Sequence, residues 1–182
     1  MTKPFKTESS QIVWSCPWYN VRQDKIITPD GRPGVYNVVQ VPGAAWIIPV
    51  TPDGNVILIR SYRYTVDAWC YEIPAGGLKP GQTLAETARQ ELLEEIGGVA
   101  ASLDYIGQFF TSNGISNEAA HIFLATGVML EHEPTPEPTE VIEIHAKSVS
   151  EVLRMAQANE ISDGPSALAL LLCAERLRKM AG

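Results

Sequence analysis

The chain has 182 residues, enough for one domain with a small additional sheet, and its 45% hydrophobic and 19% charged residues exclude a disordered protein. The formal net charge of −7 repels nucleic acids and anionic membranes, so we expect neither as a partner. A protein this acidic can act on a phosphate substrate only with local help from a metal ion or a few placed arginines.

The N-terminal part of the chain predicts two β-hairpins. Thr28-Pro29-Asp30-Gly31 is a turn signal, and the same tetrapeptide recurs at residues 51–54. Each turn lies between two runs rich in apolar and β-branched residues. We therefore expect strands at residues 18–27, 35–41, 44–50 and 56–60.

The remainder of the chain alternates helices and strands. A loop rich in Pro and Gly covers residues 74–82, and a helix over 83–96 ends at the Gly97-Gly98 stop signal. The acidic segment from Glu131 to Glu140 contains three prolines and predicts a loop. Further strands are expected near residues 102–110, 119–126 and 140–146.

Two more helices complete the predicted fold. The capping box at residues 148–151 opens a helix that reaches about residue 158, and Ser162-Asp163-Gly164-Pro165 opens the last helix. The predicted class is α+β, a mixed β-sheet with helices packed on it and a small antiparallel sheet at the N-terminus.

The cysteines and the apolar runs favour a cytoplasmic protein. Cys16, Cys70 and Cys173 are odd in number and far apart, which fits neither a disulfide framework nor zinc-ligand spacing. The first eleven residues are polar and carry no signal-peptide core. The longest apolar run, around residues 167–174, is shorter than the roughly 20 residues of a membrane helix.

The helix over 83–96 carries an acidic cluster. Glu91, Glu94 and Glu95 have i, i+3 and i+4 spacing and share one face, while an apolar face is formed by Leu84, Ala88 and Leu92. A set of hard oxygen ligands is what Mg²⁺ or Mn²⁺ requires. The alternative is a solvated acidic helix end, although glutamates there oppose the helix dipole.

The residues around this cluster resemble the Nudix box. That pattern is Gly, five residues, Glu, seven residues, Arg-Glu, an aliphatic and any residue, Glu-Glu, any residue, Gly and an aliphatic residue. When the pattern is aligned on Gly76, its positions are matched by Glu91, Leu92, Glu94, Glu95 and Gly97. The segments 60–64 and 72–76 are similar to those before the box in the ADP-ribose pyrophosphatase branch of the Nudix hydrolase family.

Three positions depart from the box. Gln82 replaces the first Glu, Gln90 replaces the Arg, and Gly98 replaces the last aliphatic residue. Exchange of one negative and one positive residue for two amides leaves the net charge of the site unchanged. A Gln82–Gln90 hydrogen bond would still hold the loop to the helix, more weakly than a charge-assisted one. Changes around metal ligands typically lower metal affinity or activity by about 10–100-fold, so these departures predict weaker catalysis.

The resemblance implies a set of metal ligands. Glu91 and Glu95 would bind Mg²⁺ or Mn²⁺ together with the Ala75 carbonyl, and Glu94 would assist directly or through water. The metal would neutralise the diphosphate and activate a water.

Other candidates are less specific. Arg60 and Arg63 could hold phosphate oxygens, with Glu72 and Gly76 beside them in the resembling segment, or they could be ordinary surface charges. Glu118 and Glu140 are the candidates for a general base, and both could instead be structural or solvated.

The substrate follows less directly from the sequence. In the resembling branch a proline stands where this chain has Asn113, which is followed by Gly114 and suits a turn equally well. Trp18 and Trp46 could stack on a base, although large aromatic residues are more often part of a core or an interface.

The resemblance predicts a nucleoside diphosphate-sugar pyrophosphatase with ADP-ribose as the leading substrate and GDP-mannose or other nucleotide sugars behind it. A second hypothesis is a weakly active nucleotide sensor of the same fold, because of Gln82 and Gln90. Residues 1–43 would form an N-terminal β segment for homodimerisation, and residues 44–182 the hydrolase domain.

Overall fold

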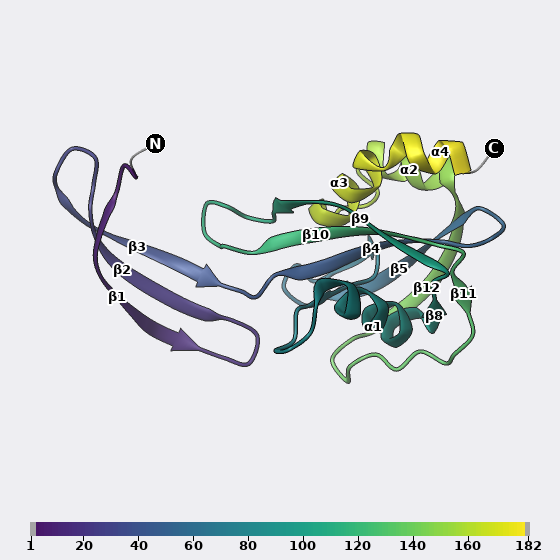
Figure 1. Ribbon diagram of the computed structural model, residues 1–182, viewed down its shortest axis with the longest axis horizontal. Coiled ribbons are helices and arrows are strands. Elements are labelled where there is room, and N and C mark those ends of the chain that lie inside the picture. The colour runs from purple at the N-terminus through teal and green to yellow at the C-terminus, as the bar shows by residue number, and fades with distance from the viewer. Residues whose placement is uncertain (1–2, 181–182) are drawn as a thin grey trace. The chain divides into compact units, whose positions relative to one another are not determined.

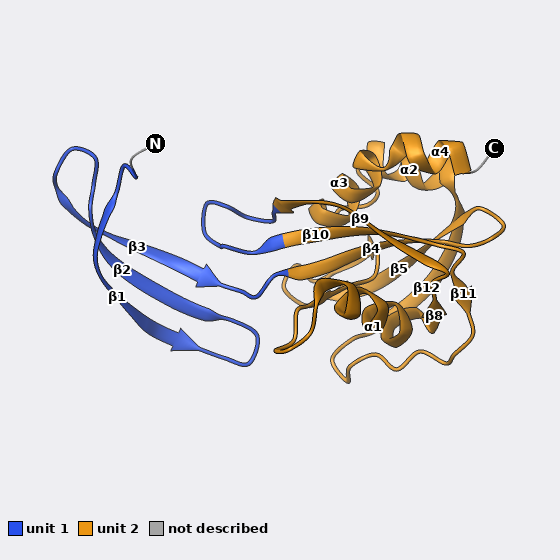
Figure 2. Cartoon of the chain, viewed as in Figure 1, with its two compact units in different colours: residues 1–43, 110–119 blue, residues 44–109, 120–182 orange. Residues whose placement is uncertain are grey.

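The computed structural model describes residues 3–180, in which secondary structure is arranged along the chain as in Figure 1. The chain divides into two compact units, shown in Figure 2. The first comprises residues 1–43 and 110–119, and the second comprises residues 44–109 and 120–182. Within the described residues, no helix has the length and apolar character needed to cross a membrane.

The first unit contains a three-stranded antiparallel sheet in the order β1-β2-β3, with β1 at Lys6–Ser15, β2 at Asn20–Ile27 and β3 at Pro33–Gln40. The predicted turn joins β2 to β3, and Gly31 has the positive φ of 84° that favours glycine. The segment 110–119 is tied to β3, since the Val39 amide donates to the Ile115 carbonyl at 2.8 Å.

The second unit is built on a mixed sheet in the order β12-β5-β4-β10-β9, with β6 paired to β5 and β7 paired to β4. β4 and β10 are parallel, and Ala44 to Val50 pair with Ala120 to Thr126. The strands of this sheet are β4 Ala44–Val50, β5 Asn55–Arg63, β6 Ala68–Glu72, β7 Ala75–Gly77, β9 Ser102–Phe110, β10 Ala119–Thr126 and β12 Ile142–Ser148. A separate pair joins β8 Gly98–Val99 to β11 Met129–Leu130.

Helices cover both faces of this sheet, with α1 on one face and α2, α3 and α4 on the other (Figure 1). The strand period of two explains the arrangement, because alternate residues of β4 and β5 enter two separate apolar clusters. Ile47 and Ile59 pack with α1, whereas Ile48 and Leu58 pack with α2 and α3. The helices are α1 Leu84–Ile96, α2 Val149–Gln157, α3 Gly164–Leu172 and α4 Ala174–Met180.

The structure adds the strands β6, β8 and β11, which were not predicted, and it differs from the predicted elements at three further places. β1 was not predicted, because all ten of its residues are exposed and give no alternation of buried and solvated positions. The loop over 74–82 includes the short strand β7, and strands of two or three residues carry no periodic signal. The single C-terminal helix is interrupted at Cys173, whose φ of −91° and ψ of 1° separate α3 from α4.

Candidate active site

Both ends of α1 are fixed by local interactions, which sets the orientation of its acidic face. Thr83 caps the N-terminus in a capping box, where its hydroxyl accepts from the Glu86 amide and the Glu86 carboxylate accepts from the Thr83 amide. Gly97 ends the helix with φ of 63°, and a Cβ there would lie 1.8 Å from the His132 carbonyl oxygen. The predicted helix and its glycine stop are therefore confirmed.

Two of the three glutamates are buried. Glu91 is 8% exposed and Glu95 is 3% exposed, while the side chain of Glu94 is 30% exposed. The solvated-helix alternative is therefore wrong for Glu91 and Glu95. Since buried carboxylates are costly unless they are bonded or coordinate a cation, this face of α1 requires an explanation beyond solubility.

The strand β7 lies directly against these carboxylates. The Ala75 amide donates to Glu95 Oε2 at 3.0 Å. A Cβ built on Gly76 would lie 2.1 Å from the carboxyl carbon of Glu91, so a larger residue at position 76 would have to displace this side chain. The glycine that begins the matched motif therefore makes space for one of the carboxylates that end it.

The carboxylates of Glu91 and Glu95 both have raised pKa values. Burial, followed by repulsion from Glu94, raises the pKa of Glu91 to about 7. Burial, followed by repulsion from Glu91, raises the pKa of Glu95 well above its usual value. Repulsion from Glu140, the candidate base, makes a smaller contribution to both increases.

Hydrogen bonds connect the two unusual glutamines. Gln82 Nε2 donates to Gln90 Oε1 at 2.5 Å, and Gln90 Nε2 donates to Glu94 Oε1 at 2.5 Å. The predicted Gln82–Gln90 hydrogen bond is thus confirmed. The structure adds Lys79, which the sequence did not single out and whose ammonium lies 3.6 Å from Glu94 Oε2.

The predicted arginines already have acidic partners. The Arg63 guanidinium forms a two-pronged pair with the buried Glu72, through Nε at 2.8 Å and a second nitrogen. Arg60 lies 3.3 Å from Glu143 and stacks over Trp69 at 5.2 Å from the ring centroid. Arg63 keeps further N–H donors that Glu72 does not use, because a guanidinium has five.

The acidic loop after β11 packs on the C-terminal end of α1. The amides of Glu131 and His132 donate to the Gly97 carbonyl, and the Thr135 amide donates to the Glu94 carbonyl at 2.7 Å. Carbonyls left without partners at the helix end are thereby bonded. Glu140 follows in this loop, where its carboxylate accepts from the Glu137 amide at 2.8 Å.

The remaining candidates lie in different surroundings. Glu118, in the first unit, accepts a hydrogen bond from the Thr111 hydroxyl at 2.7 Å. Trp18, also in the first unit, is 67% exposed. Trp46, in the second unit, is partly buried and packs against the apolar cluster under α2 and α3.

The carboxylate oxygens of α1 are the kind of ligand that a divalent cation prefers. Within residues 3–180, no three or more His, Cys, Asp or Glu side chains converge into a ready-made metal cage. Mg²⁺ does not need one, since it keeps several waters and commonly takes only one or two carboxylates. Glu91 and Glu95 are such a pair, and each is buried beside the backbone of β7.

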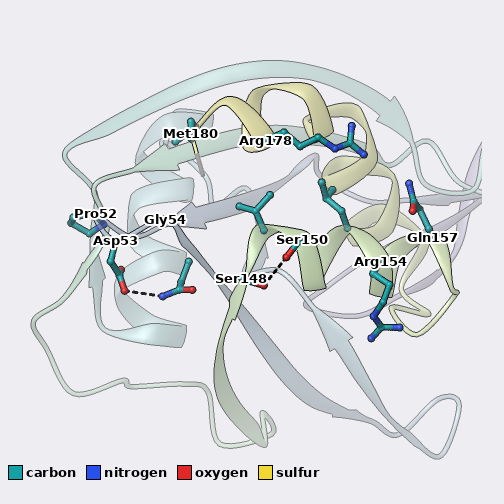
Figure 3. Close-up of a pocket in the computed structure, with 12 residues that line it drawn as sticks. Pro52, Asp53, Gly54, Ser148, Ser150, Arg154, Gln157, Arg178 and Met180 are labelled. Carbon is teal, nitrogen blue, oxygen red and sulfur yellow. Dashed lines mark hydrogen bonds between the residues drawn. The ribbon is translucent and has the colours of Figure 1, made fainter. Parts of the chain in front are cut away.

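A cavity of about 740 Å³ lies elsewhere in the second unit, between the β4–β5 turn and the helices α2 and α4 (Figure 3). Its charged residues are Asp53, Arg154 and Arg178, and the first two are already partnered. Asp53 accepts from Asn55 at 2.8 Å, and Arg154 pairs with Glu160 at 2.5 Å. The chemistry therefore favours α1 and β7 over this cavity as the active site.

Comparison with known families is consistent with this location. The family described as the NUDIX domain matches residues 41–167. A second family, described as the nucleoside diphosphate sugar hydrolase N-terminal domain, matches residues 5–39. The first match includes α1, β7 and the loop after β11.

Individual relatives extend over nearly the whole chain. An ADP-ribose pyrophosphatase of Bacillus subtilis is 30% identical over 166 residues, 91% of this chain and 90% of the relative. A methanol dehydrogenase activator of Bacillus methanolicus is 26% identical over the same shares of the two chains. A crystal structure of an ADP compounds hydrolase shares the fold, with a TM-score of 0.84 at 21% identity over 98% of this chain and 97% of that one.

Proposed function

Because this chain belongs to the Nudix hydrolase family, we propose that it cleaves the diphosphate of a nucleoside diphosphate derivative with Mg²⁺ or Mn²⁺. The leading substrate is ADP-ribose, hydrolysed to AMP and ribose 5-phosphate. The observation that carries the proposal is the burial of Glu91 and Glu95 against the backbone of Ala75 and Gly76.

In the proposed mechanism, Glu91, Glu95 and the Ala75 carbonyl would hold the metal, and Glu94 would support it directly or through water. A bound divalent cation would neutralise the diphosphate and lower the pKa of the attacking water. Arg63 would bind phosphate oxygens with the N–H groups that Glu72 leaves free.

The remaining roles in the mechanism are assigned more broadly. Glu140, which already interacts electrostatically with Glu91 and Glu95, is the favoured general base, and Glu118 is the alternative. Arg60 would assist phosphate binding, while Trp18 and Trp46 would contact the nucleobase of the substrate.

The choice of ADP-ribose is supported by the name of the Bacillus subtilis relative, an ADP-ribose pyrophosphatase. Other nucleotide sugars such as GDP-mannose remain alternatives. A weakly active nucleotide sensor is the second candidate function, supported by the neutral Gln82–Gln90 pair and by the relative that activates another enzyme. The unpaired thiols of Cys16, Cys70 and Cys173 support a cytoplasmic location.

A substrate panel tests the proposal. Nucleoside diphosphate derivatives are incubated with Mg²⁺, with Mn²⁺ or with chelator, and phosphate monoester release is measured with a coupled phosphatase. Metal-dependent release from ADP-ribose is expected. Release from another sugar nucleotide would change the substrate, and a thermal shift without release would favour the sensor.

Substitution of Gly76 by alanine should impair the enzyme. The added Cβ would collide with the Glu91 carboxylate and displace it, so we expect turnover to fall by about 10–100-fold. Gly77→Ala is the matched control, because a Cβ there meets no atom within 4 Å. Equal activity of the two variants in the same assay would argue against Glu91 as a ligand.

We further propose that the first unit forms a homodimer with a second copy. Every residue of β1 is exposed, including Ile12 and Trp14 at 51% and 49%. Large apolar side chains exposed at the end of a strand are typical of an interaction surface. Ile12→Asp is expected to convert the dimer into a monomer, as measured by light scattering. Val66→Asp, at a 63% exposed position in the second unit, should leave the dimer intact.

A further inference from the structure

The hydrogen bonds beside Glu94 run in one direction. The hydroxyl of the fully buried Thr87 lies 3.3 Å from Gln82 Oε1 and 3.2 Å from the Thr83 carbonyl oxygen, so its single proton has two acceptors within reach. The nitrogen of the Gln82 side-chain amide donates to Gln90 Oε1, and the nitrogen of Gln90 donates to Glu94 Oε1. From Gln82 onward, each side-chain donor thus points towards the carboxylate.

This direction follows from the chemistry of the amide group. A glutamine amide has a donor end and an acceptor end, so bonding at one end determines what the other end presents. Because Gln82 donates to the oxygen of Gln90, the Gln90 NH₂ faces Glu94. With Gln90 reversed, its oxygen would face a carboxylate oxygen, and two acceptors at this distance would repel.

A β-turn brings the second partner of Glu94 into place. In Lys79-Pro80-Gly81-Gln82 the backbone N–H of Gln82 donates to the Lys79 carbonyl at 3.1 Å, and Gly81 has φ of 85°. The two ends of the turn therefore face neighbouring residues of α1. Lys79 approaches Glu94 Oε2, whereas Gln82 reaches Oε1 through Gln90.

We propose that Gln82 is a positioning residue that fixes the amide orientation of Gln90 and thereby presents a hydrogen-bond donor to Glu94. Gln82 and Gln90 together are then a neutral replacement for an ion pair in holding Glu94, with Lys79 on its other oxygen. The inference deepens the proposed function and rests on it, because Glu94 is a member of the proposed metal site.

The test uses the Mn²⁺ dissociation constant of the substrate-free full-length protein, measured by electron paramagnetic resonance. Gln82→Glu has nearly the same size but offers only acceptors, so it should reverse Gln90 and weaken Mn²⁺ binding at least 10-fold. Gln82→Met removes both the hydrogen-bond donor and the acceptor of this side chain without forcing Gln90 to reverse. It should weaken Mn²⁺ binding about threefold or less. Gln82→Glu with Gln90→Arg should restore wild-type affinity or better, because arginine donates to both neighbours.

The added charge of Gln82→Glu has its own control. Ala85→Glu introduces the same charge at an exposed position in the first turn of α1, outside the chain of hydrogen bonds, and should change Mn²⁺ affinity less than threefold. Circular dichroism establishes that each variant is folded.

The outcomes separate this inference from the proposed function. Wild-type Mn²⁺ binding with equal effects of Gln82→Glu and Gln82→Met, or with tighter binding by Gln82→Glu, would overturn the inference alone. Absence of Mn²⁺ binding by the wild type would overturn the proposed function and the inference with it.

Discussion

Glu95→Gln is expected to lower hydrolysis of the best substrate by more than about 100-fold, beyond the range typical of changes around a metal ligand. Glu95 is 3% exposed and its carboxylate already accepts from the Ala75 amide. Glutamine keeps the size and an acceptor oxygen, so the fold should persist while the negative charge for a cation is lost. Steady-state kinetics with Mg²⁺ and with Mn²⁺ provide the measurement.

Glu86→Gln is the matched control for this substitution. It makes the same chemical change on the same helix, at the exposed capping box, where glutamine is an accepted substitute for glutamate. We expect its activity to stay within about twofold of the wild type. Survival of Glu95→Gln activity within about threefold would show that α1 does not provide the metal site.

Much of this site was predictable because its determinants are local. The i, i+3, i+4 spacing placed the glutamates on one face, and Gly97 ended α1 where the sequence indicated. The resemblance also implied that the Ala75 carbonyl would join Glu91 and Glu95 at one metal. What it did not reveal was the contact between Gly76 and the Glu91 carboxylate.

The role of Lys79 was not predictable from sequence spacing. A lysine before Pro-Gly in a loop ordinarily extends into solvent, and its contact with Glu94 depends on how the turn folds against α1. Arg63 and Glu72 were likewise named as site residues but not as an ion pair, because their pairing depends on the β5–β6 hairpin. Such contacts are set by tertiary geometry, for which the linear sequence gives no direct signal.

The strand β1 illustrates a different limit. Burial on one face normally gives a strand its alternating pattern, and β1 has no buried face within the chain. If the first unit pairs with a second copy, as proposed, β1 would bury its apolar side chains only in the dimer. The fold of the second unit was predictable because its sheet is covered on both faces by helices of the same chain.

Glu91→Gln should have opposite effects on stability and activity. In metal-free protein at pH 8, we expect it to raise the free energy of unfolding by about 1–3 kcal/mol, since it removes a buried charge beside Glu94 and Glu95. For a chain of this size the melting temperature should rise by roughly 3–10 °C. Hydrolysis should fall as it does for Glu95→Gln, because the proposed metal ligand is lost.

The pH dependence gives the sign of this effect. Folding raises the pKa of Glu91 from 4.5 to about 7, so the ionised carboxylate destabilises the folded state. This cost is absent below pH 4.5, grows as the pH rises towards 7, and is complete above it. Calorimetry in chelator should therefore show equal melting temperatures near pH 4.5 and a more stable variant at pH 8. Added Mg²⁺ should stabilise only the wild type, because a cation that binds the folded state compensates the same buried charge. A Glu91→Gln protein that is less stable at pH 8 would instead identify the carboxylate as a structural group.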